Sequence, residues 1–193
     1  MSTDKSSTWH RLINAAAKCF SEKGFNGASI GDIARQAEVS QGAMYTWFKG
    51  KSALISAIVE EEKNTALLNY SQPYSGSPFE RICQLVKSCI NDVGYPADHR
   101  LWVEIIAEAA RNDEVKATFM ATDLLMRNGI KTIIQDGIEK GEFDRQLEAE
   151  SATIAIYALI DGLISRKAIN PEFDLETQLP TLDGILKFIL KAT

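Results

Sequence analysis

Residues 29–51 read SIGDIARQAEVSQGAMYTWFKGK, and the organisation of the whole chain can be worked out from this segment. Ser29 can cap a short helix, because the acidic residue Asp32 follows three positions later, as in a capping box. Ser40 can cap a second short helix that begins after the turn 38–40. Two short helices joined by so tight a turn are typical of a helix-turn-helix, a motif that places its second helix in the major groove of DNA.

The second of these helices carries side chains that suit contact with DNA. Its first positions are small or polar, so that the end of the helix can enter a groove: Gln41, Gly42 and Ala43. The next positions supply a hydroxyl group, an indole N–H and flat apolar surface: Tyr45, Thr46 and Trp47. Lys51 begins the following helix, where its ammonium group can reach a phosphate. The pattern therefore predicts a DNA-reading helix.

A longer helix is predicted before the motif. Its apolar residues follow the i, i+3, i+4, i+7 spacing of one helix face: Trp9, Leu12, Ile13, Ala16 and Phe20. Ser7 or Thr8 can cap the start of this helix, and Gly24 can close it.

Downstream of the motif the sequence predicts only helices, since alternating β-branched runs and Asn-Gly turns are nearly absent. The segment 70–78, with two prolines and a glycine, is the clearest break. Amphipathic segments follow at about 79–93, 99–111, 113–140, 148–168 and 180–191. We therefore expect an all-α protein of about nine helices. The expected division is a helix-turn-helix domain over residues 1–51, a connecting helix over about 52–70, and a helical C-terminal domain over 71–193.

Composition sets the class of protein. The 193 residues are 45% hydrophobic and 24% charged, which is ordinary for a soluble globular chain. No apolar run approaches the length of a membrane span, and the N-terminus lacks the apolar stretch of a signal peptide, so we expect a cytoplasmic protein without a membrane partner. Residues 1–51 carry seven Lys or Arg and four acidic residues, a net charge of +3, whereas the whole chain carries −5. A basic N-terminal segment followed by an acidic remainder is typical of a protein that contacts phosphate through its N-terminal part only.

Enzymatic function finds no support in the sequence. His10 and His99 lie in different predicted domains without partners at metal or triad spacing, and neither a Gly-rich phosphate loop nor a GxSxG motif occurs. The cysteines Cys19, Cys83 and Cys89 form no CxxC pair, so we expect buried thiols, with redox sensing as the alternative. We therefore expect no catalysis, no metal and no cofactor.

The motif also resembles a known family. The order small-Ile-x-Asp-Ile-Ala-x-x-Ala-x-Val-Ser-x-Gly-x-hydrophobic-Tyr-x-aromatic-Phe-x-x-Lys, preceded by AAAKCFSEKGFNGAS, is similar to the signature of the TetR family over about residues 9–60. The chain departs from that signature at Glu38, where the family usually has Gly, and at Trp47, where His or Tyr is common. We expect Glu38 to adopt a positive φ, which a Glu tolerates less well than a Gly.

The resemblance implies a role for each position of the motif. Ser29, Tyr45, Trp47 and Lys51 correspond to phosphate contacts; Gln41, Ala43 and Thr46 correspond to groove-facing positions; Ser40 and Gly42 complete the predicted DNA-binding set. Gln41 is the best candidate for a hydrogen bond to a base edge. Tyr45 and Trp47 could instead pack in the core of the small domain, where we also expect Met44 and Phe48.

TetR-like regulators pair through their last two long helices, which implies a homodimer here. The corresponding residues are Ala155, Ala158, Leu159 and Gly162 in one segment and Leu182, Ile185 and Ile189 in the other. A two-fold dimer places its reading helices about 34–36 Å apart, or a multiple of that distance, on a palindrome. The alternative is that these apolar stripes pack within one chain.

The resemblance also implies a mostly apolar ligand pocket in the C-terminal domain. Candidates for its lining are Trp102, Phe119, Met120, Met126 and Tyr157, with Asp161 as a polar anchor or an interface residue. Glu104, Glu108 and Arg111 fall on another face of their helix, where we expect a solvated surface with local ion pairs.

Together these features predict a regulator that binds double-stranded palindromic operator DNA as a dimer and is released by a small-molecule inducer of unknown identity. Repression is the commoner mode in families of this resemblance. An activator of the same fold is the alternative, and a helical protein–protein adaptor is a further one.

Overall fold

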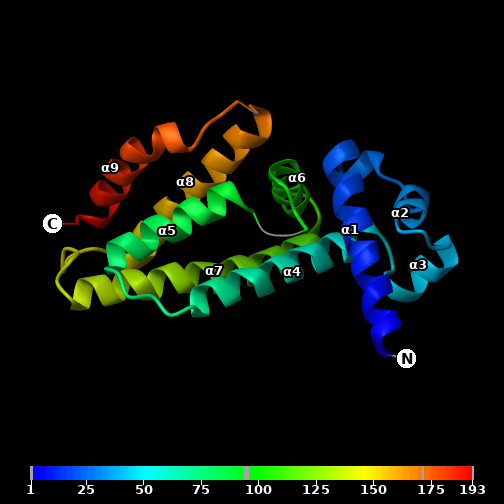
Figure 1. The fold of residues 1–193 in the computed structure, drawn as a ribbon, viewed down its shortest axis with the longest axis horizontal. Coiled ribbons are helices and arrows are strands. Elements are labelled where there is room, and N and C mark those ends of the chain that lie inside the picture. The colour runs from blue at the N-terminus through cyan, green and yellow to red at the C-terminus, as the bar shows by residue number, and fades with distance from the viewer. Residues whose placement is uncertain (1, 94–95, 171, 193) are drawn as a thin grey trace. The chain divides into compact units, whose positions relative to one another are not determined.

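The computed structural model describes residues 2–93, 96–170 and 172–192, and within these ranges the chain is all-α, as predicted (Figure 1). Its helices are α1 (Ser2–Gly27), α2 (Ile30–Gln36), α3 (Gln41–Trp47), α4 (Lys51–Ser71), α5 (Pro78–Asn91), α6 (His99–Ala109), α7 (Asp113–Glu139), α8 (Ala149–Ile169), the 3₁₀ turn η1 (Glu176–Gln178) and α9 (Leu179–Leu190). The described part holds no β-strand beyond a single bridge between Phe143 and Ala192. None of its helices is both long enough and apolar enough to cross a membrane.

The contacts group the helices into two compact units. The first unit consists of α1, α2, α3, α4 up to Thr65, α6, and α7 up to Thr122; the second consists of α5, α8, α9 and the remaining turns of α4 and α7. α6 therefore packs with the N-terminal helices, whereas the sequence interpretation assigned it to the C-terminal domain. The functional boundary near residue 71 stays a prediction.

The core of the first unit is built around α1. Leu12, Ile13 and Phe20 are almost fully buried, and α1 packs on both α2 and α6. The predicted cap at Ser7 or Thr8 is wrong: α1 begins at Ser2, because nothing in residues 2–6 breaks a helix. Gly24 does interrupt α1, with φ 71° and ψ 166°, so that the last turn of α1 bends toward α2.

In the second unit α5 packs on α8 and α9, and α8 also packs on α9. The cap of α5 is a full capping box, in which Ser77 and Glu80 bond each other's backbone N–H and Pro78 occupies the first turn. Cys83 of α5 is only half-buried, whereas Cys19 of the first unit is buried as expected. Burial, followed by the neighbouring Asp183 carboxylate, raises the pKa of the Cys83 thiol to about 12.

Candidate nucleic-acid interface

α2 begins with the predicted capping box. The Ser29 hydroxyl accepts a bond from Asp32 N at 3.0 Å and donates to Asp32 Oδ2 at 2.8 Å, and Ser29 N donates to the same carboxylate at 3.3 Å. Lys23 and Arg35 also lie 3.1 and 3.3 Å from Asp32. The bond from the Ser29 hydroxyl, followed by that from Lys23, lowers the pKa of Asp32 to about 2. The Ser29 hydroxyl has one proton and donates it to Asp32. It could donate that proton to a phosphate only if the hydrogen bond to Asp32 were broken.

The turn between α2 and α3 is a Schellman motif. Val39 N donates to Ala34 O at 3.0 Å and Glu38 N donates to Arg35 O at 3.2 Å, the two bonds that define this helix end. Glu38 occupies its left-handed position with φ 55°, which confirms the positive φ expected there. The direction of α3 therefore depends on a left-handed conformation at Glu38, which Gly adopts more easily than Glu.

α3 exposes the predicted reading face and buries the opposite one. Ser40 caps the helix as expected, accepting a bond from Ala43 N at 3.0 Å, and Thr46 Oγ1 donates back to Ala43 O at 2.6 Å. Met44 and Phe48 are buried, which confirms their place in the core. The positions left exposed are Ser40, Gln41, Gly42, Tyr45 and Thr46, whereas Ala43 and Trp47 are half-buried. With 55% of its surface exposed, Tyr45 is not a core residue.

Lys51 is directed into the protein. Its Nζ donates to Phe25 O at 2.5 Å and to Ala28 O at 3.0 Å, and it lies 4.6 Å from the centre of the Phe25 ring. Two of the three N–H groups of its ammonium are therefore used to tie the end of α1 to the start of α4. A phosphate contact of Lys51 stays a prediction, but the internal bonds are a role that the sequence interpretation missed.

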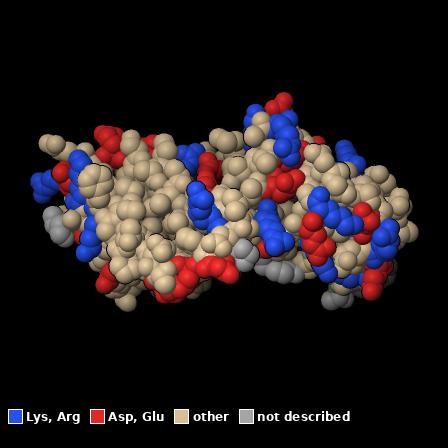
Figure 2. Space-filling model, turned by 90° about the horizontal axis from the view of Figure 1, so that it is seen from above, with Lys and Arg blue, Asp and Glu red and all other residues tan. Residues whose placement is uncertain are grey.

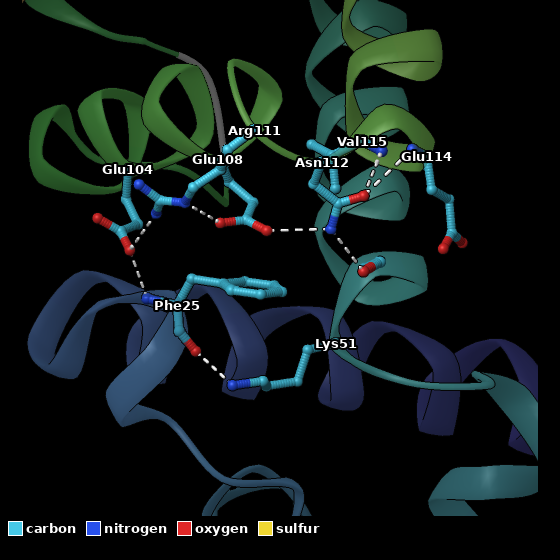
Figure 3. A network of polar contacts seen from close by, with 9 residues as sticks. Phe25, Lys51, Glu104, Glu108, Arg111, Asn112, Glu114 and Val115 are labelled. Carbon is cyan, nitrogen blue, oxygen red and sulfur yellow. Dashed lines mark hydrogen bonds and ion pairs between the residues drawn. The ribbon is translucent and has the colours of Figure 1, made fainter.

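A polar network reaches the same turn from α6 (Figure 3). Phe25 N donates to Glu104 Oε1 at 2.5 Å, next to the bend at Gly24. Arg111 bonds Glu108 at 2.8 Å, and Asn112 bonds both Glu108 and Ser52 at 3.0 Å. The expectation of a solvated face is wrong for Glu108, which is buried, because α6 packs on the N-terminal helices. The last turn of α1 is thus held by Lys51 of α4 on one side and by Glu104 of α6 on the other.

Charge is distributed without a dominant basic patch on the face shown in Figure 2, where Lys and Arg alternate with Asp and Glu. Asp32 of α2 pairs with two cations of the first unit, Lys23 of α1 and Arg35 of α2. Lys18 and Lys49 of the same unit are exposed.

The residues predicted for a dimer interface fall on α8 and α9. Exposed members are Ala155, Ala158, Gly162 and Ile185, and half-buried members are Leu159 and Ile189. Leu182 is 4% exposed and belongs to the core of the single chain, so its part in an interface stays a prediction. The sequence interpretation missed Ile154 and Phe188, which are 51% and 84% exposed. Phe188 follows Ile185 at i+3, a spacing that could have revealed it.

The residues predicted to line a ligand pocket divide between the two units. In the first unit Trp102 and Phe119 pack together, with ring centres 5.8 Å apart. In the second unit Met126 is buried, while Tyr157 and Asp161 are half-buried. Met120 is 51% exposed and lies on the surface of the single chain, so its place in a pocket stays a prediction.

Both parts of the chain match known protein families. Residues 12–58 match the bacterial regulatory proteins of the tetR family, and residues 78–190 match the C-terminal domain of the BetI-type transcriptional repressors. The HTH-type transcriptional regulator UidR of Escherichia coli strain K12 is 30% identical over 166 residues, which cover 86% of this chain and 84% of UidR. The regulator TtgR of Pseudomonas putida is 27% identical, over 84% of this chain and 80% of TtgR.

Solved structures show the same fold. GusR of Salmonella enterica superposes with a TM-score of 0.81 at 27% identity, covering 96% of each chain. FadR of Bacillus subtilis, solved in complex with stearoyl-CoA, superposes with a TM-score of 0.76 at 20% identity, covering 92% of this chain and 97% of FadR. The second likeness concerns the fold alone.

Proposed function

The chain belongs to the TetR family of DNA-binding transcription regulators, and from this we propose that it is a repressor that binds a palindromic operator as a homodimer and leaves it when a small molecule binds. The proposal rests on which side chains α3 exposes and which it buries. A short capped helix exposes Gln41, Tyr45 and Thr46 on one side and is anchored through Met44 on the other. Such a helix can enter a major groove while its domain stays folded.

Gln41 is the proposed reader of a base edge, since a carboxamide can pair with the N6 and N7 positions of adenine. Tyr45, Thr46 and the Trp47 indole are the proposed contacts to phosphate and groove wall. Phosphate contacts set the position of the protein, so the identity of the operator depends on Gln41 and its neighbours.

The proposed dimer forms through the exposed side of α8 and α9. Small residues on α8, such as Ala158 and Gly162, allow close approach of a second helix, and Phe188 offers a large apolar side chain to a partner. Figure 2 views the side on which Figure 1 draws α8 and α9, and the surface of that unit is broadly uncharged there. An interface of this composition suits self-association around a two-fold axis.

The proposed release mechanism uses α6. Glu104 of α6 accepts a hydrogen bond from Phe25 N at the end of α1, just before α2 and α3. A ligand that displaces α6 would therefore change the position of the helix-turn-helix. The ligand needs to favour the non-binding state by only a few kcal/mol to empty the operator. The stearoyl-CoA complex of FadR is an example of ligand binding by this fold and suggests acyl-CoA as a first compound to test.

The experiment selects bound sequences from a pool of random double-stranded DNA and then measures affinity by fluorescence anisotropy. We expect a palindrome to be enriched, with affinity falling steeply between about 50 and 200 mM salt. Gln41→Ala should lose discrimination at one base pair of each half-site by about 1–3 kcal/mol, while the matched control Gln146→Ala in the second unit keeps it. Equal losses on operator and random DNA would show that Gln41 is not a reader.

A reporter gene behind the selected operator distinguishes repression from activation. Higher expression when the regulator gene is deleted supports repression, and lower expression supports an activator. Failure to enrich any sequence would favour the adaptor.

A further inference from the structure

Gln41 lies across the first turn of α2, at Gly31. A Cβ atom placed on Gly31 would be 2.8 Å from Gln41 Nε2 and 3.8 Å from Gln41 Cδ. Real Cβ atoms do not approach a heavy atom that closely, so the carboxamide occupies the space that any side chain at position 31 would need. The side-chain amide of Gln41, the proposed base reader on α3, therefore lies next to Gly31 in the first turn of α2.

Position 31 does not need glycine for its backbone. The glycines with positive φ in the described chain are Gly24 and Gly141, and Gly31 is not among them. Gly31 is part of α2, where glycine is a poorer helix former than alanine. The absence of a side chain, rather than backbone freedom, is what Gly31 contributes.

Other glycines of the first unit differ from Gly31. The nearest atom to a Cβ on Gly42 would be Ser40 Oγ at 3.9 Å, and to a Cβ on Gly27 it would be Lys23 Cβ at 3.6 Å, both ordinary contacts. An alanine is therefore accommodated at these two positions without moving a neighbour. At Gly31 an alanine has to push the end of the Gln41 side chain away.

A glutamine reads adenine only if its amide oxygen and nitrogen both face the base edge. An exposed glutamine has several rotamers, and fixing one of them on binding costs free energy. Contact with α2 reduces the number of directions that Gln41 can take before DNA arrives. We propose that Gly31 is a specificity-determining residue, which acts by giving the Gln41 carboxamide the space over α2 from which it reads an A·T base pair. This inference rests on the proposed function.

The test compares Gly31→Ala with wild-type protein on the selected operator and on variants of it in which each base pair is changed in turn. The readout is the ratio of two affinities measured on one protein sample, which does not depend on the active fraction. For wild type we expect the base pair read by Gln41 to be A·T and to be preferred by about 5- to 150-fold, the factor that corresponds to 1–3 kcal/mol. Gly31→Ala should reduce this ratio at least about fivefold, while Gly27→Ala, the matched control, leaves it within about twofold.

Gly31→Ala is expected to lose specificity without losing stability. Because alanine is the better helix former, the melting temperature of Gly31→Ala should equal or exceed that of wild type. A general loss of structure would lower the melting temperature and weaken binding to all sequences alike, so it cannot imitate the expected change at one base pair.

A double-variant cycle tests whether Gly31 acts through Gln41. In the Gln41→Ala background, adding Gly31→Ala should change the ratio at that base pair by no more than about twofold. A larger change would show that the alanine acts on DNA or on another side chain, which overturns the inference. An unchanged ratio in Gly31→Ala alone also overturns it and leaves the proposed function standing. If wild type prefers no sequence, the proposed function fails and the inference fails with it.

Discussion

The left-handed residue in the turn of the reading motif gives a prediction whose size can be worked out. Glu38 has φ 55° in a turn whose two Schellman bonds leave little freedom to relax. For an L-residue this conformation costs about 1–2 kcal/mol, because Cβ approaches the following carbonyl oxygen. Glycine has no Cβ and avoids that cost, but it loses about 0.5–1 kcal/mol more backbone entropy on folding. We expect Glu38→Gly to stabilise the folded chain by about 0.5–1 kcal/mol.

Glu38→Ala is the matched control. It removes the same exposed side chain but keeps the Cβ and hence the strain, so its stability should stay within about 0.5 kcal/mol of wild type. The difference between the glycine and alanine variants therefore isolates the backbone conformation from any surface charge effect.

Stability is measured by chemical and thermal denaturation at one fixed protein concentration, since dimerisation makes the melting temperature depend on concentration. For a chain of this size the glycine variant should melt about 1–4 °C above the alanine variant. Hydrogen exchange of the α2 amides supplies a local readout of the same turn. A glycine variant no more stable than the alanine variant would show that Glu38 is not strained, and the reasoning would be refuted.

Three other predictions concern residues on which the structure gives new information. Lys51→Met should lower the free energy of unfolding by about 1–2 kcal/mol, because two carbonyl groups lose a charged donor; a lysine that served only phosphate would leave denaturation curves unchanged. The folded state lowers the pKa of Asp32 from its ordinary value of 3.8 to about 2. The Asp32 carboxylate therefore stabilises the folded state above about pH 4, and this stabilisation is lost as the pH falls toward 2. Asp32→Asn should therefore be less stable than wild type at pH 7 and lose less stability between pH 4 and pH 2 in melting curves; parallel curves for the two proteins would contradict the assignment. Phe188→Arg should convert the dimer to a folded monomer in analytical ultracentrifugation, because Phe188 is 84% exposed in the single chain; dimers of unchanged affinity would place the interface elsewhere.

The local elements of the motif could be predicted from the sequence because their signals are local. Ser29 with Asp32, and Ser40, are caps whose partners lie within three residues, and both helices begin where these residues predict. The positive φ of Glu38 was expected because the signature that the motif resembles usually has Gly at this position. The start of α1 was wrong for a related reason: a good cap such as Ser7 permits a helix to begin but does not require it to.

What the sequence could not supply were contacts between distant residues. Phe25 and Glu104 are 79 positions apart, and no periodicity links the end of α1 to α6. The inward direction of Lys51 depends on where the carbonyl groups of Phe25 and Ala28 end up after α1 bends at Gly24. The contact of Gln41 with Gly31 likewise exists only once the turn has brought two helices together.

The bond between Phe25 N and Glu104 has a consequence for building hybrid regulators. A graft that takes residues 1–51 onto another member of the family carries the donor and the Lys51 bonds but leaves the acceptor behind. The recipient then has to provide a carboxylate at the position of Glu104, in a helix that packs on α1. A hybrid regulator should therefore take α6 from this protein together with the helix-turn-helix. The junction between the two parent sequences should lie after α6.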